Sequence, residues 1–212
     1  SSEQLNALNK VLAKPVLTLG SEDFHLDGKA LIAALADADA RQLNLPGLQL
    51  RLEALPPVLE KHPHTQVLLF GQGPELARIR AAVQQSALLS QHVQLPGFRN
   101  DLDKILPCLD LLVHPAYMEG LGVSLLQAAS CGVPIIGGRA GGIPEVVRDG
   151  VNGRLMTPGD ATELSHQMHE LLKQPEMRQR MGQAGLALVK DEFSVEAMVK
   201  GNWLNYQSLV SA

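Results

Sequence analysis

The stretch DLLVHPAYMEGLGVSLLQAASCGVPIIGGRAGGIPE, residues 110–145, decides the fold of this chain. Two short apolar runs, at 110–115 and 133–138, each lead into a turn rich in glycine, and the residues at 124–129 have the composition of an apolar helix. Strand, turn, helix and strand in this order form the repeating unit of a parallel sheet covered by helices. The sequence therefore predicts an α/β fold with a ligand site in its turns.

A single acidic residue, Glu119, enters the first of these turns, which contains Gly120 and Gly122. Glycine lets the backbone approach a ligand, and the first N–H groups of the following helix favour an anion such as phosphate. Because a carboxylate repels phosphate, we expect Glu119 to bind a neutral donor such as a sugar hydroxyl. A glutamate that only caps the turn is equally compatible with the sequence. The turn indicates a site for a phosphorylated sugar.

Further polar and aromatic residues are candidates for the same site. Gln127 follows Glu119 by eight residues, about 12 Å along a helix, and its amide suits the ribose hydroxyls of an elongated ligand. A glutamine that faces solvent is the alternative. His114 is the histidine that is close enough to line the pocket. Phe98 and Arg99 follow a strand at 92–97, where a base could stack, although packing of Phe98 against the core is favoured.

The same alternation of strands and helices extends along the rest of the chain. We expect further strands at 15–20, 66–71, 92–97 and 153–160, the last as a short edge strand that ends in a turn. We expect helices at 29–39, 48–61, 75–89, 102–106, 161–173, 175–190 and 195–210.

Composition narrows the function classes. The 212 residues are 45% hydrophobic and 19% charged, with a net charge of −4, which gives no reason to expect nucleic acid as a partner. Two cysteines form no disulfide framework, so a reducing, cytoplasmic setting is expected. The seven histidines lack the spacing of a metal site; those at 62, 64, 166 and 169 are expected on a solvated surface, and Cys131 is expected as a small buried residue. Peripheral membrane contact through a further domain stays open.

These motifs resemble the C-terminal, nucleotide-sugar-binding domain of retaining glycosyltransferases of family 4, the group 1 glycosyl transferases with a GT-B fold. The segments that carry the resemblance are LLFGQGPE, VQLPGFRNDL and residues 114–160. It implies a Rossmann-like three-layer α/β/α domain at 15–212, one half of a GT-B fold, with 1–14 as the end of an interdomain linker.

The resemblance also implies roles for individual residues. The catalytic residue is Glu119, the first glutamate of an E-x7-E motif, which contacts the donor sugar. The second glutamate, which binds ribose, is replaced by Gln127. Phe98 and Arg99 match the segment that contacts the base. The turn that binds the donor through its backbone comprises Gly120, Leu121, Gly122, Val123 and Ser124.

A second departure from the family concerns an arginine and a lysine that normally follow the first strand and neutralise the diphosphate. With 15–20 as this strand, Lys29 is the nearest substitute. With ALIAALAD as the strand, Arg41 takes the place of the arginine and Pro46 that of the lysine. The first register is favoured because PVLTLG has the better strand composition, although it requires about twenty inserted residues.

The resemblance implies metal-independent, retaining transfer of a sugar from a UDP- or GDP-sugar, without a further cofactor, to a glycan or lipid-linked acceptor. The acceptor domain of the same protein would be missing, so the chain alone is expected to be inactive, and the last helix is expected to cross towards that domain. A non-catalytic module that binds a sugar nucleotide is the main alternative. A GT-B epimerase and a nicotinamide oxidoreductase fit less well, the latter because the glycine fingerprint near residue 71 is incomplete.

Overall fold

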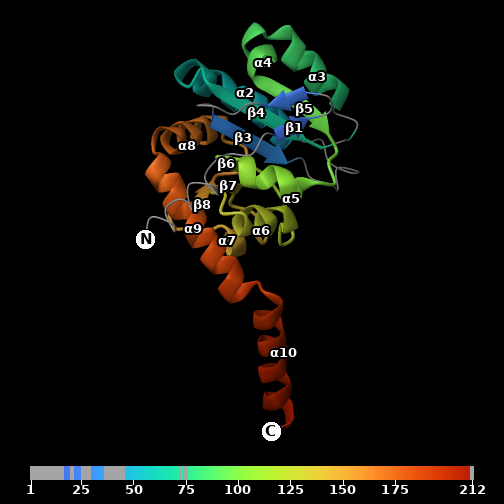
Figure 1. Ribbon diagram of the computed structural model, residues 1–212, viewed down its shortest axis with the longest axis vertical. Helices are drawn as coiled ribbons and strands as arrows, with labels where there is room; N and C mark the ends of the chain where they lie inside the picture. The colour runs from blue at the N-terminus through green and yellow to red at the C-terminus, as the bar shows by residue number, and fades with distance from the viewer. Residues whose placement is uncertain are drawn as a thin grey trace.

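A parallel sheet of six strands runs through the centre of the molecule (Figure 1). The computed structural model describes residues 17–19, 22–24, 30–35, 46–71, 73 and 76–210. The strand order is β5-β4-β3-β6-β7-β8, and every neighbouring pair is parallel. The strands are β3 (Ala30–Leu35), β4 (Thr65–Phe70), β5 (Val93–Gly97), β6 (Leu111–His114), β7 (Ile135–Gly138) and β8 (Gly153–Met156). This is the order of a doubly wound Rossmann-like sheet, so the predicted fold class is confirmed.

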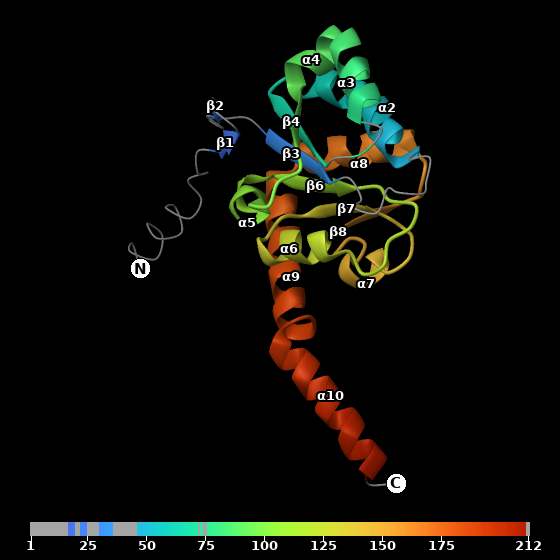
Figure 2. The ribbon, with the colours of Figure 1, turned by 90° about the vertical axis from the view of Figure 1, so that its right-hand side faces the viewer.

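Helices cover both faces of the sheet (Figure 2). One face carries α2 (Pro46–Lys61), α3 (Leu76–Gln85), α4 (Ala87–His92) and α8 (Ala161–Lys173). The other carries α5 (Leu102–Ile105), the 3-10 turn η1 (Leu106–Cys108), α6 (Val123–Ser130) and α7 (Ile143–Val146). α9 (Pro175–Glu192) contacts α6, α8 and the edge strand β8, and α10 (Val195–Val210) follows it.

The strands divide the core into two apolar clusters because successive side chains point to opposite faces. In β4, Leu68 packs towards α6 while Val67 and Leu69 pack towards α2. In β7, Ile135 and Ile136 divide in the same way. A strand buried on both faces is apolar along its whole length, which is why β4, β6 and β7 were recognisable from the sequence.

The first strand of the sheet is where the prediction was wrong. Residues 29–39 were expected to form a helix, but Ala30–Leu35 is the central strand β3. It pairs with β4 on one side and β6 on the other, and this pairing outweighs the weak helical preference of an alanine-rich run. The expected strand at 15–20 instead contributes β1 (Leu17–Leu19) to a separate antiparallel pair with β2 (Glu22–Phe24). The strand of the alternative register is therefore the one that belongs to the sheet.

The remaining elements agree with expectation, with one exception. The helix predicted at 75–89 is divided into α3 and α4, because the Ser86 side chain caps the second helix by accepting a hydrogen bond from the Leu89 N–H at 3.2 Å. The helices predicted at 161–173 and 195–210 have the observed bounds. Residues 1–14, expected as a linker, lie outside the described residues.

α10 runs away from the sheet as a single projecting helix (Figures 1 and 2). No side chain in α10 is buried. Among the described residues, no helix combines the length and apolar character that a membrane crossing requires.

Candidate functional site

The candidate site lies where the chain changes direction within the sheet. β3 and β6 are neighbours, but the chain continues from β3 to one edge of the sheet and from β6 to the other. Ligands of doubly wound folds bind at the carboxyl ends of the strands at such a switch point. The loop 115–122 leaves β6 at this point, and the loop 139–142 leaves the adjacent strand β7.

These two loops are locked together by close backbone contact. The Gly142 N–H donates a hydrogen bond of 3.1 Å to the carbonyl oxygen of Glu119. Gly141 has a φ of +52°, and a Cβ atom at this position would overlap the same carbonyl oxygen. A glycine is therefore required at residue 141, both for its left-handed backbone and for the approach of the β6 loop. The sequence predicted glycine turns but not this contact between them.

The β6 loop ends at the N-terminus of α6. Gly122 is the N-cap residue of α6, with a φ of 76°, and α6 begins at Val123. The first N–H groups of a helix have no acceptor within the helix and carry the positive end of its dipole. The predicted turn from Gly120 to Ser124 thus forms an open helix N-terminus, in which Leu121 and Val123 are exposed.

Glu119 is held beside this helix N-terminus by both oxygens of its carboxylate. Its Oε2 lies 3.1 Å from Nε2 of His114, the last residue of β6. Its Oε1 accepts a hydrogen bond of 3.0 Å from the Gly120 N–H. No side chain caps α6, but Glu119 does accept the Gly120 N–H within the turn, so the geometry agrees both with a sugar contact and with a glutamate that caps the turn. The carboxylate is fixed in orientation and remains 20% exposed.

Gln127 lies on the exposed surface of α6, one turn after Val123. This position agrees both with contact to an elongated ligand and with the alternative of a glutamine that faces solvent. The structure places Gln127 on the same helix as the predicted anion site. Its role in ribose binding stays a prediction.

Phe98 and Arg99 lie at the end of β5, three strand positions from β6 and thus about 14 Å away across the sheet. Phe98 is 65% exposed, so the expectation that it packs into the core is wrong, and its ring is available to a base. The Arg99 guanidinium donates two hydrogen bonds to Asp101, from Nε at 2.7 Å and from Nη2 at 2.6 Å. This hydrogen bonding raises the pKa of Arg99 and lowers that of Asp101.

The basic residues expected near the diphosphate fall in a part of the chain that is not described. Lys29 and Arg41 both lie outside the described residues. Because β3 begins at Ala30 and ends at Leu35, Lys29 precedes the strand, and the segment that follows the strand contains Arg41. The correct register therefore moves the expectation of a phosphate-binding cation from Lys29 to Arg41. In this register Pro46, the first residue of α2, is expected at the position of the second cation.

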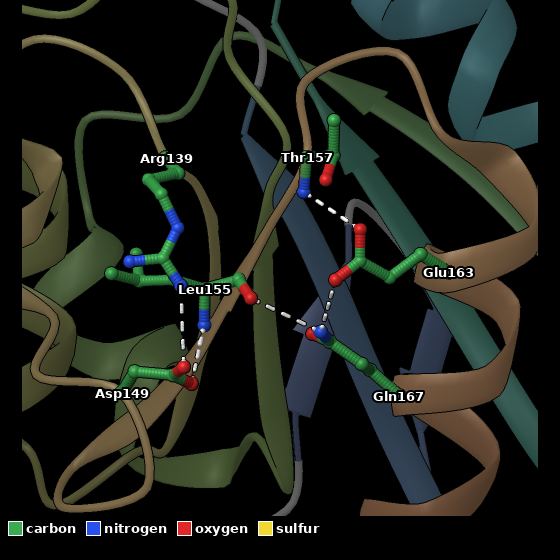
Figure 3. A network of polar contacts seen from close by, with 6 residues as sticks. All are labelled: Arg139, Asp149, Leu155, Thr157, Glu163 and Gln167. Atoms are coloured by element: carbon green, nitrogen blue, oxygen red, sulfur yellow. Dashed lines mark hydrogen bonds and ion pairs between the residues drawn. The ribbon is translucent and has the colours of Figure 1, made fainter.

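A polar network that the sequence did not reveal holds the neighbouring loops in place (Figure 3). Asp149 accepts hydrogen bonds from the Leu155 N–H at 3.0 Å and from Arg139 at 3.3 Å, which ties the β7 loop to β8. Glu163 of α8 accepts a hydrogen bond of 2.8 Å from the Thr157 N–H. Gln167 donates to Glu163 and to the Leu155 carbonyl, both at 3.1 Å. Most of these contacts join different elements, so they depend on how the β7 loop, β8 and α8 meet in space.

The described residues contain no group of three or more His, Cys, Asp or Glu side chains that could hold a metal ion. His62 and His169, which the sequence placed on a solvated surface, are half-buried and joined by a hydrogen bond of 2.8 Å. Cys131 is half-buried rather than fully buried, and burial raises the pKa of its thiol.

The chain is similar to known proteins in sequence and, by comparison with solved structures, in fold. It is 36% identical over 134 residues to the N-acetyl-alpha-D-glucosaminyl L-malate synthase of Bacillus anthracis. The aligned region covers 63% of this chain and 35% of that protein. It is 35% identical over 156 residues to a GDP-mannose-dependent phosphatidylinositol monomannoside mannosyltransferase of Corynebacterium glutamicum. The aligned region covers 69% of this chain and 40% of that protein. The chain thus spans well under half the length of these relatives.

Solved structures agree on the fold. HepE of Anabaena in complex with UDP superposes with a TM-score of 0.72 at 22% identity, over 100% of this chain and 54% of that chain. The C-terminal domain of LpcC from Francisella tularensis superposes with a TM-score of 0.68 at 23% identity, over 78% of this chain and 87% of that chain.

The family assignment rests on sequence. The family model for group 1 glycosyl transferases matches residues 41–187, which include β4 to β8 and both glycine loops. The chain belongs to the group 1 glycosyl transferase family.

Proposed function

We propose that this chain is the donor-binding half of a glycosyltransferase and binds a nucleotide-sugar across the carboxyl edge of its sheet. The observation that carries the proposal is the fixed carboxylate of Glu119 beside the open N-terminus of α6. An anion at this helix N-terminus would be stabilised by the free N–H groups. A carboxylate at its side accepts hydrogen bonds, as sugar hydroxyls require.

Within this proposal, each part of the site takes one part of the ligand. Glu119 contacts the sugar, the turn from Gly120 to Ser124 surrounds the phosphates, and Gln127 reaches the ribose. Phe98 supports the base, because its exposed ring lies at the carboxyl end of β5. The distance of about 14 Å between β5 and β6 is on the scale of an extended nucleotide.

Both UDP- and GDP-sugars are proposed donors. The relative from C. glutamicum is named for its dependence on GDP-mannose, and the similar structure from Anabaena contains UDP.

We propose transfer with retention of configuration and without a metal ion, to a glycan or lipid-linked acceptor. Backbone N–H groups at the start of α6 would stabilise the negative charge of the leaving diphosphate. Arg41 would add a cation if it faces the same site. The acceptor would be held by a further domain of a longer protein, so residues 1–212 alone are expected to transfer little sugar.

Calorimetric titration of the chain with UDP, UDP-glucose, GDP and GDP-mannose tests this proposal. We expect binding of at least one nucleotide-sugar, weakened about tenfold by Glu119→Ala, because a hydrogen bond to a charged group is lost. Binding of the corresponding nucleotide should change little. Glu60→Ala is the matched control, because Glu60 is exposed near the end of α2, at the opposite edge of the sheet.

A non-catalytic module that binds a sugar nucleotide is the second candidate, favoured by Gln127 and by Pro46 in place of a cation. Both candidates bind the donor. The two candidates can be distinguished with a longer protein that contains the acceptor domain. If the protein is an enzyme, it consumes the donor, and if it is a binding module, it does not.

A further inference from the structure

His114 occupies a special place at the switch point. It is the last residue of β6, which lies between β3 and β7. Its side chain is 2% exposed, while the carboxylate that it contacts is 20% exposed. A titratable ring is thus buried directly behind the proposed contact for the sugar.

The contact restricts the protonation of this ring. The Nε2 atom of His114 lies 3.1 Å from Oε2 of Glu119, and an ionised carboxylate only accepts hydrogen bonds. Nε2 therefore carries a hydrogen and donates it to Glu119. The assignment of this hydrogen follows from the partner.

His114 completes a set of three contacts that fix Glu119. The Gly120 N–H holds the other carboxylate oxygen at 3.0 Å, and the Gly142 N–H holds the Glu119 backbone carbonyl at 3.1 Å. Each carboxylate oxygen can accept about two hydrogen bonds. Each carboxylate oxygen can thus accept one further hydrogen bond from a ligand, and the contacts with the protein fix the plane of the carboxylate.

We propose that His114 is a positioning residue that orients the Glu119 carboxylate towards the hydroxyls of the donor sugar. This role rests on the proposed function. His114 acts through Glu119 and does not itself contact the donor. Its loss leaves the carboxylate held by the Gly120 N–H alone, so affinity falls for the sugar part of the ligand and not for the nucleotide.

Two variants separate positioning from simple filling of the core. His114→Phe keeps a ring but removes the donor, and His114→Gln keeps a side-chain N–H. Calorimetry with UDP and UDP-glucose, and with GDP and GDP-mannose, gives the affinity of each variant. We expect His114→Phe to bind the nucleotide-sugar about tenfold more weakly and the nucleotide unchanged, and His114→Gln to recover most of the loss.

A double-mutant cycle with Glu119→Ala tests whether His114 acts through Glu119. In the Glu119→Ala background, His114→Phe should cause no further loss of affinity for the nucleotide-sugar. Thermal unfolding of each variant shows whether it is folded. If His114→Phe does not fold, the cycle is run with His114→Gln and His114→Asn, whose shorter side chain cannot reach Glu119 in the same way.

Three results overturn the inference. Equal losses for nucleotide and nucleotide-sugar indicate a structural role, and additive losses in the cycle indicate independent action. If His114→Phe binds the nucleotide-sugar with unchanged affinity, Glu119 does not need His114 to orient it. Affinity still falls in Glu119→Ala in this case, so the proposed function stands. If the wild-type chain binds no nucleotide-sugar, the proposed function itself fails, and the role of His114 fails with it.

Discussion

At the scale of single residues, the two glycine loops contact each other through Glu119 and Gly142 and contain most of the residues proposed to bind the donor. The sequence could single out Glu119 and its glycines as candidates, because turn, helix start and carboxylate are adjacent in it. The contact of Glu119 with His114 and the requirement for glycine at residue 141 could not be predicted, because they depend on how two loops meet in space.

Gly141→Ala should destabilise the fold by about 2 kcal/mol or more. The new Cβ would overlap the Glu119 carbonyl oxygen, and an L residue strains the left-handed backbone at this position. Urea unfolding measures the change. Gly120→Ala is the control, since a Cβ there meets nothing within 4 Å, and its free energy of unfolding should remain within about 0.5 kcal/mol of wild type. Equal stabilities of the two variants would contradict the requirement for glycine at residue 141.

Gln127→Glu should raise affinity for the nucleotide about fivefold. A charged acceptor forms a stronger hydrogen bond with a ribose hydroxyl than a neutral amide does, by roughly 1 kcal/mol. Gln84→Glu on α3 introduces the same charge on another exposed helix position and should leave affinity unchanged. If calorimetry finds no gain, or the same gain in both variants, Gln127 does not contact the ribose.

At the scale of elements, helices and strands could be predicted where the residues of the segment itself favour the structure that it adopts. α8 has the predicted bounds, and Asp160 stabilises its start as the N-cap residue, whose side chain accepts a hydrogen bond from the Glu163 N–H at 2.8 Å. β3 was missed because its alanines favour a helix locally, and only the strands on both sides make it a strand.

The contact between the end of α2 and α8 should make stability depend on pH. Burial, and then the charges of His169, Arg178 and Lys61, lower the pKa of His62 below its usual 6.5. Just below pH 6.5 the unfolded chain therefore binds more protons at His62 than the folded chain does, so stability falls as pH decreases through this window. His62→Gln should reduce this slope in urea unfolding between pH 5.5 and 7.5. His64→Gln, at an exposed position in the same turn, should retain it; equal slopes in wild type and His62→Gln would refute the account.

α10 should add little to the stability of the domain. Its spacing of three and four residues places five exposed apolar side chains on one face of the helix: Val195, Val199, Trp203, Tyr206 and Val210. Removal of residues 195–212 should change the free energy of unfolding by less than about 1 kcal/mol. None of the apolar side chains of α10 is buried, so their removal takes no contacts out of the hydrophobic core. A larger loss in urea unfolding would show that α10 packs on the domain. That α10 crosses to the acceptor domain stays a prediction.

At the scale of the whole molecule, the chain is a member of the group 1 glycosyl transferases that spans 35 to 40% of the length of the relatives described above. The sequence identifies the family, and the solved structures agree on the fold. The activity that we propose is that of a longer protein with an acceptor domain.

Such a longer protein should transfer sugar equally well after treatment with EDTA, since we propose that backbone N–H groups and cationic side chains stabilise the leaving diphosphate. Product formation from the donor that the chain binds is the measurement. Loss of activity that added Mg²⁺ or Mn²⁺ restores would contradict the metal-independent mechanism.

The central claim, that a nucleotide-sugar binds at the glycine loops, is tested most directly by following the backbone amide signals of the ¹⁵N-labelled chain by NMR during titration with UDP-glucose and GDP-mannose. With at least one of the two donors, the amides of Gly120, Gly122, Val123 and Ser124 should shift together with those of Gly141 and Gly142. Shifts confined to other regions, such as α2 and α8, would show that the ligand binds elsewhere and contradict the account.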